Sequence, residues 1–101
     1  MEIRSTHSDG KYVIYPRGEL TLQTAHTLRA LIGSCLRDRG FCFTLDFRDV
    51  TYIDSTGIGT LLSLDALLRH QGGSLQIRNV AAPIMHIIRL ARLDGLLPIS
   101  T

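Results

Sequence analysis

The tetrapeptide Asp54-Ser55-Thr56-Gly57 holds the residues best suited to chemistry in this sequence. It precedes a leucine-rich stretch, so we expect it to form the first turn of a helix, where free amides and the helix dipole favour negative charge. Ser55 offers a hydroxyl there, and Gly57 has no side chain, which we expect to leave room for the backbone of a partner. The tetrapeptide therefore predicts a serine that can carry a phosphate. It also fits a plain helix cap formed by Asp54 and Ser55.

Catalytic interpretations of the same residues fail at particular positions. Ile53 stands where the Gly-x-Ser-x-Gly elbow of serine hydrolases has its first glycine. Leu62 stands where a dinucleotide fingerprint beginning at Gly57 would have its third small residue. Lys11 is the only lysine, which excludes a phosphate-binding loop ending in Gly-Lys and a receiver-type phosphorylation site. We expect neither an enzyme nor a bound cofactor.

Metal binding is not supported by the possible ligands. Asp46, Asp49 and Asp54 fall on a strand end and on loops, with no periodicity that would bring them together, so we expect solvated turn carboxylates. Cys35 and Cys42 do not form a Cys-x-x-Cys pair and are expected to be small buried hydrophobic side chains. The four histidines are too far apart for a short metal motif.

The elements that must position the tetrapeptide follow from hydrophobic spacing and turn residues. We expect a hairpin of residues 3–7 and 12–17 joined by Ser8-Asp9-Gly10, followed by a helix over 22–38 with Thr21 as N-cap and Gly40 as its left-handed stop. A central strand over 41–47 and a helix from the tetrapeptide to Gly72-Gly73 come next. The chain should end with a strand over 75–80, a helix from Pro83 to about Asp94-Gly95, and an extended piece over 97–99. The order β-β-α-β-α-β-α-β predicts an α/β fold. Its mixed sheet should be antiparallel at the hairpin and parallel elsewhere.

Length and composition bound the class of protein. A chain of 101 residues is the size of one domain, here 1–101, and 45% hydrophobic with 20% charged residues excludes a disordered chain. The apolar runs are too short to cross a bilayer and the N-terminus has no secretory pattern, so we expect no membrane association and a cytoplasmic location. A net charge of +2 with scattered arginines disfavours nucleic acid.

Several segments, taken in order and spacing, resemble one family. They are Gly18-Glu19-Leu20, Asp46-Phe47, Ile53-Asp54-Ser55-Thr56-Gly57-Ile58-Gly59, Gly72-Gly73, Pro83 and Leu93-Asp94-Gly95-Leu96. From about Tyr12 to Ile99 the chain resembles the STAS domain and, within it, the bacterial anti-sigma factor antagonists. The Asp-Ser-Thr-Gly core is the most specific motif of that family, and Thr21 stands where the family usually has an aspartate.

The resemblance implies a partner-switching protein without catalysis of its own. Ser55 would be the residue that a partner kinase phosphorylates, within a partner-binding surface of Asp54, Ser55, Thr56, Gly57, Ile58, Gly18, Glu19 and Thr21. The unphosphorylated domain would bind an anti-sigma factor that is also its serine kinase, and so release a sigma factor. Phosphorylation would end that binding, and a serine phosphatase would restore it.

Two other hypotheses stay open. The chain also resembles a STAS subunit that docks constitutively on a lipid-transport ATPase complex or a stress-signalling scaffold, with Ser55 as a cap only. Ser55 followed by Thr56 favours the phosphorylation switch, because lipid-transport subunits resembling this chain tend to lack the serine. A nucleotide or small-anion receptor at the same helix N-terminus is the third hypothesis.

Overall fold

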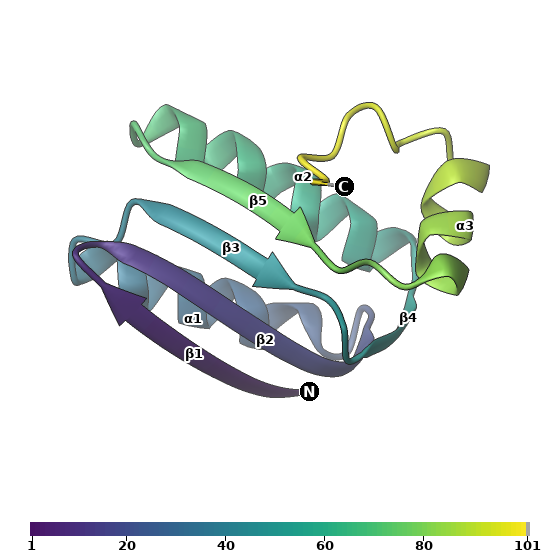
Figure 1. Cartoon of the computed structure of the whole chain (residues 1–101), viewed down its shortest axis with the longest axis horizontal. Coiled ribbons are helices and arrows are strands. Elements are labelled where there is room, and N and C mark those ends of the chain that lie inside the picture. Colours follow the sequence, from purple (N-terminus) through teal and green to yellow (C-terminus); the bar gives the residue numbers. More distant parts are fainter. Residues whose placement is uncertain (101) are drawn as a thin grey trace.

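The computed structural model describes residues 1–100, which form a mixed five-stranded sheet and three helices (Figure 1). The chain runs through β1 (Glu2–Ser8), β2 (Lys11–Leu20), α1 (Ala25–Arg37), β3 (Cys42–Asp46), β4 (Val50–Ile53), α2 (Ser55–His70), β5 (Ser74–Arg78) and α3 (Ala82–Leu90). The strand order is β1-β2-β3-β5, with β4 pairing on β2. Only β1 is antiparallel to its neighbour, so the predicted α/β class and mixed sheet are confirmed.

The predicted hairpin between β1 and β2 is also confirmed. Ser8 pairs with Lys11, and the two residues between them, Asp9 and Gly10, have φ angles of 52° and 77°. Left-handed conformations at both central positions are what a two-residue hairpin turn of type I′ requires, which is why Asp-Gly marks it in the sequence.

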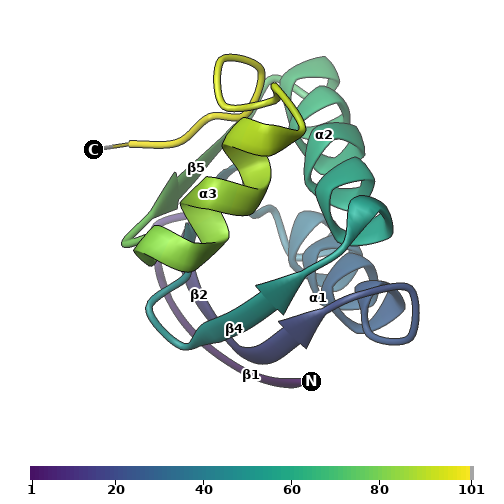
Figure 2. The same ribbon diagram turned by 90° about the vertical axis from the view of Figure 1, so that its right-hand side faces the viewer.

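The core lies between the sheet and two helices, because alternate strand residues point to the same side. Helices α1 and α2 lie together on one face of the sheet, whereas α3 lies at the end of the molecule beside β4 (Figure 2). The fully buried side chains come from all of these layers and include Ile14, Leu28, Ile32, Phe43, Leu45, Leu61, Leu68, Ile77 and Ile88. The sheet face and the helix stripes thus bury each other.

The order of elements differs from the prediction in two places. Residues 50–53 form the additional strand β4, whose inner residues Thr51 and Tyr52 are both exposed, so no alternation reveals it in the sequence. The extended piece at 97–99 contributes a single parallel bridge between Ile77 and Ile99 instead of a strand. The third helix also ends earlier, at Leu90, because Arg92 takes a left-handed φ of 58°.

The first helix begins at Ala25, and Thr21 is not its N-cap. The Thr24 hydroxyl accepts a hydrogen bond from the Thr21 amide (2.9 Å) and donates one to the Glu19 carbonyl (2.7 Å), which holds residues 21–24 in a turn. Leu22, where the predicted helix would begin, lies on that turn and is 65% exposed. Local hydroxyl bonding therefore competes with the helix at its start.

The left-handed residue after the first helix is Arg39, with φ of 68°, and not Gly40. Gly40 is required for space instead, because a Cβ there would lie 2.7 Å from the Tyr12 ring and 2.8 Å from the Cys35 carbonyl oxygen. The sequence therefore predicted correctly that a left-handed residue follows the first helix, but the residue is Arg39 and not Gly40.

Asp46 is fully buried, contrary to the expectation of a solvated carboxylate. Its Oδ1 accepts hydrogen bonds from the amide and Nε of Arg48, and its Oδ2 accepts from a terminal nitrogen of Arg48 (2.9 Å), from Arg78 Nε (3.1 Å) and from Asn79 Nδ2 (3.0 Å). Burial alone would raise the pKa of Asp46, but the hydrogen bonds from Arg48, Arg78 and Asn79 outweigh it and hold that pKa well below its usual value. The carboxylate therefore joins the ends of β3 and β5.

Replacing this carboxylate should weaken the fold in a pH-dependent way. Because the pKa of Asp46 is lowered in the folded protein, its contribution is present at neutral pH and is lost as the pH falls below the ordinary value of 3.8. We expect Asp46→Asn to lower the free energy of unfolding by about 1–3 kcal/mol at neutral pH. The deficit relative to the parent should shrink at pH 3, as measured by urea unfolding at both pH values.

Asp49→Asn is the matched control, because Asp49 is exposed and lies only three residues away. It should change the unfolding free energy by less than about 0.5 kcal/mol. Equal losses for the two variants at neutral pH would contradict the assigned role of Asp46.

Candidate functional site

The tetrapeptide and the end of β2 meet because β2 and β4 are parallel neighbours. Leu20 pairs with Ile53, and the Asp54 amide donates a hydrogen bond to the Leu20 carbonyl (3.3 Å). The chain therefore leaves both strands at the same edge, where the turn of residues 21–24 lies beside the start of α2 (Figure 2). This pairing brings residues 18–21 to the tetrapeptide, as the predicted partner-binding surface requires.

Asp54 positions the first turn of α2. Its Oδ1 accepts a hydrogen bond from the Gly57 amide (2.8 Å), which caps the helix, and its Oδ2 accepts one from the Leu22 amide (3.2 Å). One half-buried carboxylate thus fixes the helix start against the turn that follows β2. The cap is Asp54 alone, and the expectation that Ser55 shares it is wrong.

Ser55 is the first residue of α2 and is exposed together with Thr56. The Ile58 amide donates to the Asp54 carbonyl (3.0 Å) and the Gly57 amide to the Asp54 side chain. The amides of Ser55 and Thr56 have no acceptor within residues 1–100. A negatively charged group on Ser55 would therefore lie at the positive end of a helix without displacing any existing hydrogen bond.

Gly57 and Ile58 are buried and support the site from within. Gly57 is buried, and a Cβ there would overlap the carbonyl oxygen of Leu20, so the missing side chain lets α2 approach β2. Ile58 is 4% exposed and belongs to the core. This corrects the expectation that Gly57 leaves room for a partner.

The remaining predicted residues lie at the surface with two apolar neighbours that the sequence analysis missed. Gly18, Thr21 and Asp54 are half-buried, whereas Glu19, Ser55 and Thr56 are exposed. Leu22 is 65% exposed beside Asp54, and Tyr52 is 46% exposed where β4 pairs with Glu19. We call Glu19, Leu22, Tyr52, Ser55 and Thr56 the tip surface. Two threonines at positions 21 and 24 were the available signal that a turn, and not a helix, presents Leu22.

The tip surface carries exposed hydroxyl, apolar and acidic side chains. Its charged member is Glu19, with the Asp54 carboxylate beside it. No three His, Cys, Asp or Glu side chains gather as metal ligands in the described part of the chain, where Cys35 and Cys42 are free thiols. None of the helices within residues 1–100 is long and apolar enough to cross a membrane.

Two glycines of α2 offer a matched test of this packing. Gly57→Ala should lower the free energy of unfolding by about 1–3 kcal/mol, because the added methyl group meets the Leu20 backbone. Gly59→Ala, one half-turn away and with nothing within 4 Å of the added Cβ, should raise it by about 0.5–1 kcal/mol through helix propensity. Urea unfolding of both variants measures the difference. Stabilisation by Gly57→Ala would contradict the close approach of α2 and β2.

Two proteins of known role resemble this sequence over most of its length. An anti-sigma-B factor antagonist of Bacillus subtilis (strain 168) is 29% identical over 83 residues, which cover 82% of this chain and 75% of that protein. An anti-sigma F factor antagonist of Paenibacillus polymyxa is 24% identical over 101 residues, which cover 98% of this chain and 86% of that protein.

Solved structures share the fold. The anti-sigma factor antagonist SpoIIAA in its unphosphorylated form matches with a TM-score of 0.76 and 17% identity, over 99% of this chain and 88% of that chain. The Bacillus cell fate determinant SpoIIAA in the phosphorylated form matches with a TM-score of 0.73 and 19% identity, over 99% of this chain and 92% of that chain.

A family model provides the assignment. The model described as Mlab, STAS domain matches residues 3–98, a span that includes every helix and all but the first residue of the strands. The matched span contains the Asp-Ser-Thr-Gly turn at the start of α2. The chain therefore belongs to the STAS domain family.

Proposed function

We propose that this protein is an anti-sigma factor antagonist whose binding is switched by phosphorylation of Ser55. The observation that carries the proposal is the exposed Ser55 hydroxyl on a helix turn that Asp54 alone caps. A kinase could reach this hydroxyl without unfolding the turn, and the cap would survive the reaction. The names of the two relatives support the antagonist role, because this chain resembles both proteins over most of its length.

In this proposal the unphosphorylated tip surface binds an anti-sigma factor that is also a serine kinase, and a sigma factor is released. Leu22 and Tyr52 supply apolar area, and Ser55 is the first residue of α2, next to the Asp54 cap. The kinase binds the ATP, so the present chain is a substrate and ligand and not an enzyme. In this proposal the exchange takes place in the cytoplasm.

Phosphorylation would end the binding electrostatically. A phosphoserine adds about −1.5 to −2 charges at neutral pH. The tip surface would then hold this charge beside Asp54 and Glu19, so an interface formed there must desolvate three anionic groups. Because the Ser55 and Thr56 amides receive the phosphate favourably, the fold itself would stay intact. A serine phosphatase then returns the chain to its binding state.

Constitutive docking is the second candidate function, because Leu22 and Tyr52 are exposed whether or not Ser55 is modified. A lipid-transport ATPase complex or a stress-signalling scaffold would bind the same tip surface permanently. Phosphorylation and binding measurements separate the two candidates.

The phosphoacceptor should be Ser55 and not Thr56. Both hydroxyls are exposed, but the Ser55 hydroxyl is primary and less hindered than the β-branched one of Thr56. After incubation with ATP and the anti-sigma factor kinase of the same genome, mass spectrometry should place one phosphate on Ser55. Ser55→Ala should abolish the modification and Thr56→Ala should retain it. Phosphate on Thr56 with Ser55 unmodified would overturn the assignment.

Charge at position 55 should weaken binding without weakening the fold. Ser55→Asp should reduce affinity for the kinase partner at least about tenfold, a loss of about 1.4 kcal/mol, whereas the uncharged Ser55→Asn and Ser55→Ala should bind as the parent does. Because Asp54 forms the cap, Ser55→Ala should change the free energy of unfolding by less than about 0.5 kcal/mol. Ser55→Asp should raise it by about 0.3–1 kcal/mol through the helix dipole.

Calorimetry measures the affinities and urea unfolding the stabilities. Equal affinities for Ser55→Asp and Ser55→Asn would remove the switch and leave constitutive docking as the function.

A further inference from the structure

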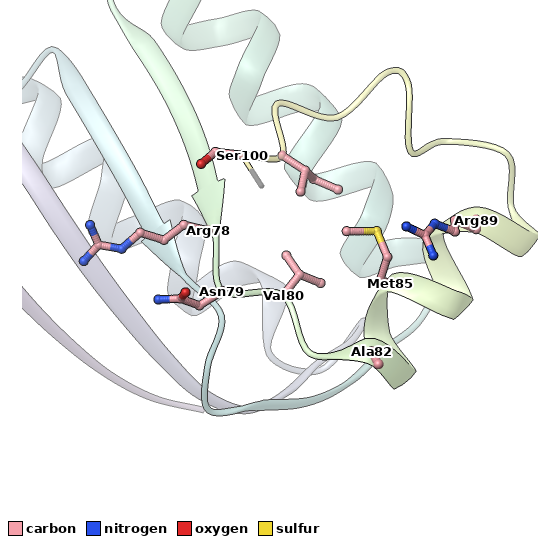
Figure 3. Close-up of a pocket in the computed structure, with 8 residues that line it drawn as sticks. Arg78, Asn79, Val80, Ala82, Met85, Arg89 and Ser100 are labelled. Carbon is pink, nitrogen blue, oxygen red and sulfur yellow. The ribbon is translucent and has the colours of Figure 1, made fainter.

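A cavity of about 560 Å³ lies away from the tip surface, between the end of β5, helix α3 and residues 99–100 (Figure 3). None of the tip-surface residues lines it. Its volume falls within the roughly 300–1,000 Å³ of pockets that bind small molecules. The proposed switch makes no use of it.

Helix α3 provides one wall through residues that share a helix face. Ile84 and Ile88 point into the core and are buried, which fixes the orientation of the helix. Ala82, Met85 and Arg89 follow one another at helical spacing on a different face and line the cavity. The face that supports the cavity is therefore set by core packing on the other side of α3.

The opposite wall is held by backbone bonds and by the buried carboxylate. The Ser100 amide donates to the Ile77 carbonyl (2.8 Å), which keeps residues 99–100 beside β5. Arg78 and Asn79 both donate to Asp46, and Figure 3 shows their side chains extending away from Met85 and Arg89. These two polar side chains are therefore engaged elsewhere and do not fill the cavity.

The lining combines an apolar floor with a single available cation. Val80, Met85 and Ile99 line the cavity from three segments, and the Val80 and Met85 side chains and the Arg89 guanidinium extend toward the same space (Figure 3). Arg89 forms no ion pair within residues 1–100, and no acidic side chain lines the cavity there.

We propose that this cavity binds a monocarboxylate with a short alkyl body. The carboxylate matches Arg89 in charge and in its forked hydrogen-bonding geometry. The alkyl body matches Val80, Met85 and Ile99, and the flexible thioether of Met85 adapts to its shape. A cation would meet Arg89 unfavourably, and a neutral alcohol would lose the charge-assisted bond.

The test uses octanoate with the chain of residues 1–101, and heteronuclear NMR and isothermal titration follow the binding. Saturable binding is expected, with the largest shift changes at residues 80–89 and 99–100. Octanol should bind at least about tenfold more weakly, and octylammonium should not compete. Saturation by octanol or octylammonium at the octanoate concentration would contradict the charge match.

Three variants locate the site. Arg89→Gln should weaken octanoate binding about tenfold, whereas Arg37→Gln, which removes an exposed charge from α1, should leave it unchanged. Ala82→Phe places a ring in the cavity from an exposed first-turn position and should abolish binding while the spectrum of the folded protein persists. Equal effects of Arg89→Gln and Arg37→Gln, unchanged binding by Ala82→Phe, or no saturable binding by the parent would overturn the proposal.

Discussion

The pairing of β2 with three different strands is the constraint on which the rest of the structure depends. Along its first part β2 lies between β1 and β3, and from Gly18 onward it pairs with β4, with a shift in register between Gly18 and Glu19. Gly18 has a φ of 102°, a conformation that side-chain-bearing residues rarely adopt, so the change of partner occurs where the backbone can turn. Without this change, α2 would not begin beside the end of β2.

Two aspartates stabilise different parts of the carboxyl edge of the parallel strands. Asp46 is buried and binds Arg48, Arg78 and Asn79, which joins β3 to β5. Asp54 is half-buried and accepts only backbone amides, from Leu22 and Gly57. The first carboxylate gains from charged donors and the second from the start of a helix, so both stabilise the edge while only Asp54 borders the surface.

Because Asp54 forms the cap of α2, the helix start does not depend on the side chain of Ser55. A residue that caps a helix loses its role when it is modified, whereas an exposed first-turn serine beside an aspartate cap can be changed without cost to the helix. The same arrangement keeps Leu22 and Tyr52 at the surface, because the turn after β2 is held by hydroxyl and carboxylate bonds and not by burial. The residues that hold the tip surface in place are therefore different from Ser55, the residue proposed to be phosphorylated.

Local signals in the sequence were enough to determine the hairpin, the central strand, the three helices, the α/β class and the helix start at the tetrapeptide. Asp9-Gly10, the strand of residues 41–47 and the leucines of α2 express these features over a few residues, where turn chemistry and periodicity act. The existence of β4, the burial of Asp46 and the space needed at Gly57 were decided only by the tertiary structure, whereas the later start of α1 follows from local hydroxyl bonding at Thr24. Asp46 binds Arg78, which is 32 positions away in the sequence, and Gly57 in α2 packs against the Leu20 carbonyl at the end of β2. Neither contact can be predicted from a local sequence pattern.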